Sequence, residues 1–159
     1  MKNLLILGCG WVGEELARQL KKKGWNLWVT TRTEEKYHRL QSDGIFAFIH
    51  DFDRDLNLDL PVDVSFDAIV NSIPATQRNT EAEIEHRFSH VFNILCSLNY
   101  KKHIFLSSVG VYPDRDCDFD ESFGDEELMS AKLRLAEKKM MSLPYSSTFR
   151  LGGLFGKER

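Results

Sequence analysis

Three closely spaced glycines constrain the fold of this chain more than any other feature of its sequence. Gly8, Gly10 and Gly13 stand between an apolar run at residues 3–7 and a charged, amphipathic stretch that ends at Gly24. Because glycine has no Cβ, Gly8 allows a tight strand-to-helix turn and Gly13 allows the helix to press on the strand before it. An unbroken apolar run is typical of a strand buried on both faces of a parallel sheet. The sequence therefore predicts a strand-turn-helix unit that opens a parallel α/β sheet.

The same spacing, G-x-G-x-x-G, is the pattern of a dinucleotide-binding turn. Gly10 would let a ligand lie against bare main chain, and the N–H groups of Trp11 and Val12 at the start of the helix would face a pyrophosphate. Gly8, Gly10, Trp11, Val12 and Gly13 are therefore candidate cofactor-binding residues. The alternative is an ordinary strand-to-helix turn that binds no ligand.

Strands and helices alternate along the rest of the chain. We expect further strands at residues 25–33, 45–50, 66–73, 103–108 and 146–156, and helices at residues 12–23, 34–44, 79–99 and 126–142. This alternation predicts an α/β fold: a doubly wound parallel sheet of the Rossmann type, with about six strands and helices on both faces. A chain of 159 residues matches a single domain, 1–159, with its ligand crevice at the carboxyl ends of the strands.

The end of the second predicted strand bears on the choice of cofactor. Sites that prefer NAD usually carry an acidic residue there, which holds the ribose hydroxyls. This chain reads Thr30, Thr31 and Arg32 instead. An arginine can pair with a 2′-phosphate through two hydrogen bonds, so we expect NADP, with NAD as the alternative. The other interpretation of Arg32 is an ordinary arginine on a solvated rim.

Composition excludes several classes of function. The net charge is −3 and the sequence pI is about 6.0, with no extended basic stripe, so we expect no nucleic-acid partner. The first apolar run is too short to span a bilayer and leads into the glycine turn, so we expect no membrane association. These features favour a cytoplasmic protein.

Cysteines and histidines give no clear metal or disulfide pattern. Cys9, Cys96 and Cys117 are scattered, which indicates neither a disulfide framework nor a zinc site. Cys9 lies near a helix N-terminus, where a thiolate would be favoured; it is either a redox residue or a small residue that fits the turn. His86 and His90 could meet one metal ion from one helix, but no third ligand is apparent, so we expect no metal.

The order of motifs resembles the extended and atypical short-chain dehydrogenase/reductases, the NAD(P)-dependent epimerases and dehydratases of nucleoside-diphosphate sugars. The resemblance covers essentially the whole chain. It is carried by "GCGWVG" at residues 8–13, "DFD" at 51–53, "NSIPA" at 71–75, "FLSSVGVY" at 105–112, "SAKLRLAE" at 130–137 and "RLGGLFG" at 150–156.

This resemblance implies a set of cofactor contacts beyond the glycine turn. Asp51 and Phe52 would flank the adenine. Ile73, Pro74 and Ala75 would line the ribose and pyrophosphate side of the cofactor.

The resemblance also implies catalytic residues. Ser108 matches the hydroxyl that polarises a substrate oxygen, and Lys132 matches the lysine that holds the nicotinamide ribose. The family's tyrosine, four residues before that lysine, is replaced by Leu128, which cannot transfer a proton. Tyr112 is the candidate substitute, entering the site from the other side, although a packed tyrosine is the alternative.

The chain resembles only the dinucleotide-binding part of such proteins, without most of the C-terminal substrate lobe. The function expected is an epimerase, dehydratase or reductase that binds NADP and acts on a nucleotide-sugar or a similar carbonyl compound. The alternative is a catalytically weak or inactive NADP-binding sensor or interaction module. Family members pair through two helices, here residues 79–99 and 126–142, which implies a homodimer.

Overall fold

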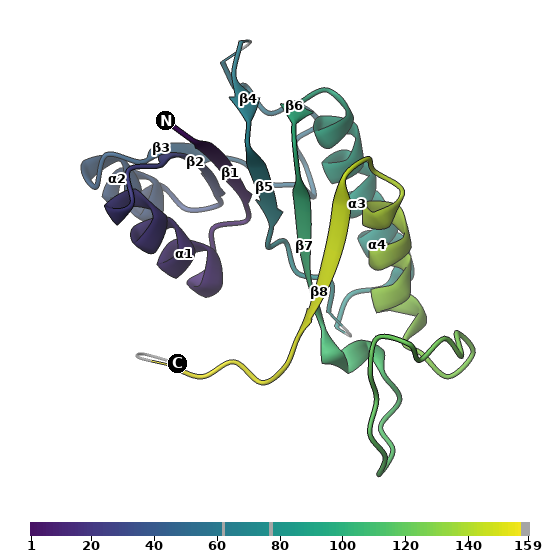
Figure 1. Ribbon diagram of the computed structural model, residues 1–159. Coiled ribbons are helices and arrows are strands. Elements are labelled where there is room, and N and C mark those ends of the chain that lie inside the picture. Colours follow the sequence, from purple (N-terminus) through teal and green to yellow (C-terminus); the bar gives the residue numbers. More distant parts are fainter. Residues whose placement is uncertain (62, 77, 157–159) are drawn as a thin grey trace.

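A six-stranded sheet forms the centre of the protein, which a computed structural model describes over residues 1–61, 63–76 and 78–156 (Figure 1). The strands follow the order β3-β2-β1-β5-β7-β8, and every neighbouring pair is parallel. Their bounds are β1 Asn3–Leu7, β2 Asn26–Thr31, β3 Phe46–Ile49, β5 Ala68–Asn71, β7 His103–Ser108 and β8 Ser146–Leu151. The predicted doubly wound parallel sheet is confirmed.

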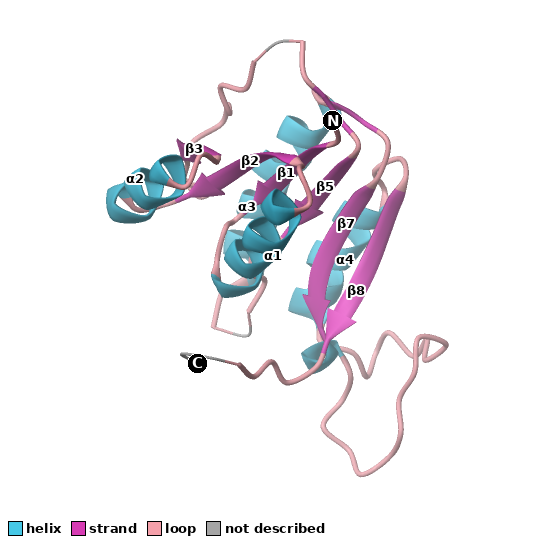
Figure 2. Cartoon of the chain, turned by 60° about the vertical axis from the view of Figure 1, so that its left-hand side comes forward, coloured by secondary structure: helices cyan, strands magenta, loops and turns pink. Residues whose placement is uncertain are grey.

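Helices cover both faces of this sheet, as Figures 1 and 2 show. Their bounds are α1 Trp11–Lys22, α2 Glu34–Ser42, α3 Glu81–Cys96 and α4 Ala131–Met141. Alternate residues of β1 point to opposite faces: Leu4 and Ile6 pack in one core cluster with α1 and α2, and Leu5 and Leu7 pack in another with α3 and α4. This burial on both sides explains the continuous apolar run of β1.

Helix α3 owes its start to a capping box. The Glu83 N–H donates to Thr80 Oγ1 (3.2 Å), and the Thr80 N–H donates to the Glu83 carboxylate (2.7 Å). These two bonds satisfy main-chain groups that a helix end otherwise leaves unpaired. They fix the position of α3 relative to the loop that leaves β5.

Helix α4 begins later than the sequence predicts. The Ser130 hydroxyl accepts the N–H of Leu133 (3.5 Å) as an N-cap, so residues 126–129 form turns before the helix rather than its first turn. Strand β8 likewise ends at Leu151 instead of continuing to residue 156, because Gly152 and Gly153 follow.

A small second sheet escaped prediction. Strand β4 (Ser65–Phe66) pairs in parallel with β6 (Asn99–Tyr100). A strand of two residues is too short to show a period of two, so hydrophobic alternation cannot reveal it.

Candidate functional site

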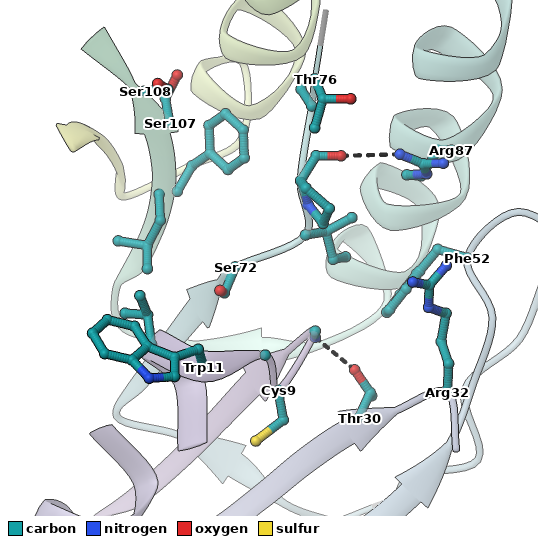
Figure 3. Close-up of a pocket in the computed structure, with 18 of the residues that line it drawn as sticks. Cys9, Trp11, Thr30, Arg32, Phe52, Ser72, Thr76, Arg87, Ser107 and Ser108 are labelled. Carbon is teal, nitrogen blue, oxygen red and sulfur yellow. Dashed lines mark hydrogen bonds between the residues drawn. The ribbon is translucent and has the colours of Figure 1, made fainter. Parts of the chain in front are cut away.

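A cleft of about 1090 Å³ opens at the carboxyl ends of the strands (Figure 3). In a doubly wound sheet this is the edge at which ligands bind. Most of the predicted site residues line it: Gly8, Gly10, Trp11, Val12, Thr31, Arg32, Asp51, Phe52, Ile73, Pro74, Ala75 and Ser108. Residues far apart in the sequence therefore meet at one site.

The glycine turn forms the floor of the cleft. Gly8 has a φ of +76°, and a Cβ at this position would lie 3.1 Å from Ile73 Cγ1, so both its backbone conformation and its surroundings require glycine. The Gly8 N–H donates to Thr30 Oγ1 (2.8 Å; dashed in Figure 3), which joins the turn to β2. Gly10 differs: a Cβ there would meet no described atom closer than Gly8 O at 3.9 Å. The space above Gly10 is open to a ligand.

Gly13 supports the turn from behind instead of lining the cleft. A Cβ at Gly13 would lie 3.1 Å from Ile6 Cγ2 and 3.4 Å from Gly8 O, so glycine lets α1 approach β1 closely. Gly10 is the N-cap of α1 and has no side chain to cap the helix. The N-terminus of a helix attracts negative charge through its first N–H groups and its dipole, and here it opens onto the cleft.

Two cationic side chains, Arg32 and Lys36, line the cleft near the end of β2. Arg32 follows Thr31 and is exposed, and in Figure 3 its side chain rises from β2 toward Phe52. Lys36 of α2 also lines the cleft; its Nζ donates to the carbonyl oxygen of Cys9 (3.0 Å) and pairs with Glu14 (3.1 Å). Sequence reasoning missed Lys36. No local pattern marks Lys36, because its contact with Cys9 depends on how α2 packs beside the glycine turn.

The loops after β3 and β5 also line the cleft. Phe52 is buried, and its ring meets the ring of His50 edge to face at a centroid distance of 4.3 Å. After β5, the N–H of Ile73 donates to the side-chain oxygen of Asn71 (3.1 Å), which turns the main chain toward the cleft ahead of Pro74 and Ala75.

The structure brings Ser108 to the cleft but not Tyr112 or Lys132, which are not among the described residues that line it. The Tyr112 hydroxyl donates to the carbonyl oxygen of Asp120 (2.8 Å) and accepts from Arg150 (2.9 Å). On α4 it is Leu133, next to Lys132, that is buried and lines the cleft. Of the three candidate catalytic residues, Ser108 is thus the one found among the described residues that line the cleft.

A buried carboxylate lies directly behind the cleft, and sequence reasoning missed it. Ser107 lines the cleft and donates from Oγ to Glu137 Oε1 (2.7 Å). Arg150 donates to both oxygens of Glu137 (3.0 and 2.9 Å), and Arg134 donates to Oε2 (2.7 Å). Burial raises the pKa of Glu137, but the hydrogen bonds from Arg150, Ser107 and Arg134 outweigh burial and hold the pKa below the usual value of 4.5. The carboxylate is therefore a charged anchor for the end of β7.

Cys9 does not have the environment expected of a redox thiolate. The side chain is buried, and burial raises its pKa to about 11 despite the opposing charge of Lys36. The thiol is therefore protonated at neutral pH, which favours the interpretation of Cys9 as a small residue that fits the turn.

The part of the chain that the structure describes shows neither a metal cluster nor a membrane-spanning helix. It contains no group of three or more histidine, cysteine or acidic side chains placed to hold a metal ion. No helix in these ranges is long and apolar enough to cross a membrane.

A known protein family matches most of this chain. The model of the NAD dependent epimerase/dehydratase family matches residues 4–141, and the chain belongs to that family. Membership supports a nicotinamide dinucleotide as the class of cofactor and a small molecule as the class of substrate. No curated protein matches the chain.

Solved structures show the same fold. A protein from Bacillus halodurans assigned as an NAD-dependent epimerase/dehydratase is 20% identical, with a TM-score of 0.67 over 99% of this chain and 73% of its own. A Methylobacillus flagellatus protein with the same assignment is 21% identical, with a TM-score of 0.68 over 98% of this chain and 55% of its own. Gre2 from Candida albicans, solved with NADPH, is 15% identical, with a TM-score of 0.65 over 98% and 59%. The chain thus spans between about half and three quarters of these structures.

Proposed function

We propose that this protein binds NADP(H) in the cleft. The pyrophosphate would lie against the main chain at Gly10 and the N-terminus of α1, and the adenine would lie beside Phe52. The observation that carries the proposal is the open space above Gly10, since a Cβ there would fill the position that a phosphate needs. The family match and the NADPH bound to Gre2 support the class of ligand.

We further propose that Arg32 selects NADP over NAD by pairing with the 2′-phosphate. Arg32→Glu is expected to weaken NADP binding about 50-fold, because it replaces a charge-assisted hydrogen bond with repulsion. NAD lacks this phosphate, so its affinity should change little. Isothermal titration calorimetry with both dinucleotides measures the difference. Arg115→Glu, which makes the same charge change outside the cleft, is the matched control. Equal losses for the two dinucleotides would refute the role of Arg32.

The reaction we propose is hydride exchange at the nicotinamide, with the Ser108 hydroxyl polarising the oxygen of a carbonyl group. Ser108 Oγ accepts the N–H of Gly110 (3.1 Å), which orients the hydroxyl while its proton stays available to a substrate. The substrate would be a nucleotide-sugar or a similar small carbonyl compound, as in an epimerase, dehydratase or reductase.

Turnover of NADPH tests this reaction. The purified protein is mixed with NADPH and a panel of nucleotide-sugars, ketones and aldehydes, and the loss of NADPH absorbance is followed. Ser108→Ala is expected to lower kcat/KM about 100-fold, the usual cost of removing one hydrogen-bond donor to a developing oxyanion. Ser142→Ala, at the C-terminal end of α4 outside the cleft, should leave the rate unchanged.

A non-catalytic dinucleotide sensor is the second candidate function. The observation that favours it is the engagement of the Tyr112 hydroxyl by Asp120 and Arg150, together with an apolar Leu133 where the helix faces the cleft. Tight NADPH binding without turnover of any substrate in the panel would select this function.

Pairing of two copies through α3 and α4 and a cytoplasmic location also remain predictions. Analytical ultracentrifugation at micromolar concentration tests the pairing, and cell fractionation tests the location.

A further inference from the structure

Arg87 of α3 holds the loop that follows β3. Its guanidinium donates from Nε to Asp53 Oδ1 (2.7 Å) and from Nη2 to Asp53 Oδ2 (2.8 Å), a two-point pair whose geometry is more specific than a single hydrogen bond. The side chain of Arg87 is 13% exposed and lines the cleft. The pair therefore fixes Asp53 and the neighbouring main chain at one wall of the cleft.

The same guanidinium also reaches the loop that leaves β5. Nη1 donates to the carbonyl oxygen of Pro74 (3.0 Å; dashed in Figure 3) and to the side-chain oxygen of Asn79 (3.3 Å). Pro74 belongs to the loop that leaves β5, and Asp53 belongs to the loop that leaves β3. One side chain thus joins two loops that line the cleft.

Two histidines of α3 also bond the main chain of the loop that follows β3. His90 Nδ1 donates to the carbonyl oxygen of Phe52 (2.9 Å), and His86 Nε2 donates to that of Asp53 (3.2 Å). His90 lies one helical turn after both His86 and Arg87, so the three side chains reach the same loop from neighbouring positions on α3. The main chain at Phe52 and Asp53 is therefore fixed by α3 rather than by the sheet, which it has already left.

The charges of the Arg87–Asp53 pair persist over a wide pH range. The hydrogen bond from Arg87 is the main cause that lowers the pKa of Asp53, and the bond to Asp53 is the main cause that raises the pKa of Arg87. Both groups stay ionised through neutral pH.

We infer that Arg87 is a positioning residue for the dinucleotide, holding the adenine-side loop and the loop of Ile73, Pro74 and Ala75 at a fixed separation. The inference rests on the proposed function of the cleft. Because Arg87 already orders these loops in the free protein, less conformational entropy is lost when the ligand binds. The contacts of Arg87 therefore raise the affinity for the ligand. Arg87 acts on the adenosine half that NADP, NAD and ADP share, whereas Arg32 acts on the 2′-phosphate alone.

Calorimetry with NADP, NAD and ADP on the folded full chain tests this role. Arg87→Met is expected to weaken all three ligands about 20-fold, the size of losing a charge-assisted two-point contact that orders a site. Arg87→Lys keeps the charge and one bond, so it should recover part of the affinity and guards against a variant that fails to fold. Lys139→Met is the matched control. Lys139 of α4 bonds Glu85 and Ser89 of α3, the helix that carries Arg87, but these contacts lie outside the cleft.

The outcomes separate the inference from the proposed function. Unchanged affinity in both Arg87 variants, with only a lower melting temperature, would show a structural role and overturn the inference alone. A loss confined to NADP would also overturn it, since Arg87 would then be a phosphate ligand. A wild-type protein that binds none of the three ligands would overturn the proposed function and this inference with it.

Discussion

Replacing Glu137 with Gln is expected to lower the free energy of unfolding by about 3 kcal/mol at pH 7, since breaking a buried ion pair leaves its partners uncompensated. The side chain of Glu137 is only 2% exposed and accepts hydrogen bonds from Ser107, Arg134 and Arg150. The neutral amide removes the charge that balances two guanidinium groups while keeping nearly the same volume. Urea denaturation followed by circular dichroism measures the change.

The effect of Glu137 on stability should depend on pH in a definite direction. Its pKa in the folded protein lies below the usual 4.5, because the hydrogen bonds from Arg150, Ser107 and Arg134 outweigh the effect of burial. A lowered carboxyl pKa contributes stability that is fully present above pH 4.5 and is lost as the pH falls through the folded value. The difference between wild type and Glu137→Gln should therefore be constant from pH 7 to about pH 5 and shrink below it.

Glu85→Gln is the matched control for this prediction. Glu85 also accepts a hydrogen bond from a cation, Lys139, but its side chain is 48% exposed. An exposed pair contributes less than about 1 kcal/mol, so this variant should unfold close to wild type. Equal losses from Glu85→Gln and Glu137→Gln, or a difference at Glu137 that does not shrink in acid, would show that burial of the carboxylate is not the cause.

Much of the fold could be predicted because its signals are local. The apolar run of β1, the glycines of the first turn and the stop at Gly24 each depend on residues close together in the chain. The short strands β4 and β6 have no such signal, because only their pairing across the fold defines them.

The residues of the site also fall into those that the sequence could predict and those that only the fold brings together. Gly10 and Arg32 were predicted from the glycine spacing and from the end of the second strand, and Phe52 was implied by the family resemblance. All three line the cleft. Lys132 was assigned by the family resemblance alone; it is not among the described residues that line the cleft, and its role stays a prediction. Contacts such as Glu137 with Arg150 and Arg87 with Asp53 join charges that are distant in the sequence. Their partners could not be chosen from many other charged residues without the fold.

The surroundings of Gly10 separate its role in binding from any role in folding. Its φ of −80° is accessible to any residue, and a Cβ would meet Gly8 O at 3.9 Å, an ordinary van der Waals distance. A side chain at Gly10 would instead occupy the space in front of the N-terminus of α1. Gly8 cannot serve for this test, because its φ of +76° and its contact with Ile73 would strain any substitution.

Gly10→Val is therefore expected to abolish dinucleotide binding while the protein stays folded. We expect at least about a 100-fold loss of affinity for both NADP and NAD, since the branched side chain excludes the pyrophosphate from the helix N-terminus. The stability should fall by only about 1 kcal/mol, the usual cost of replacing a favourable N-cap residue with an aliphatic one. Calorimetry measures the first effect and thermal unfolding the second, with Gly124→Val in an exposed loop as the control. Retained affinity in a folded Gly10→Val protein would show that the pyrophosphate does not lie against this turn, and the assignment of the cleft as a dinucleotide site would be wrong.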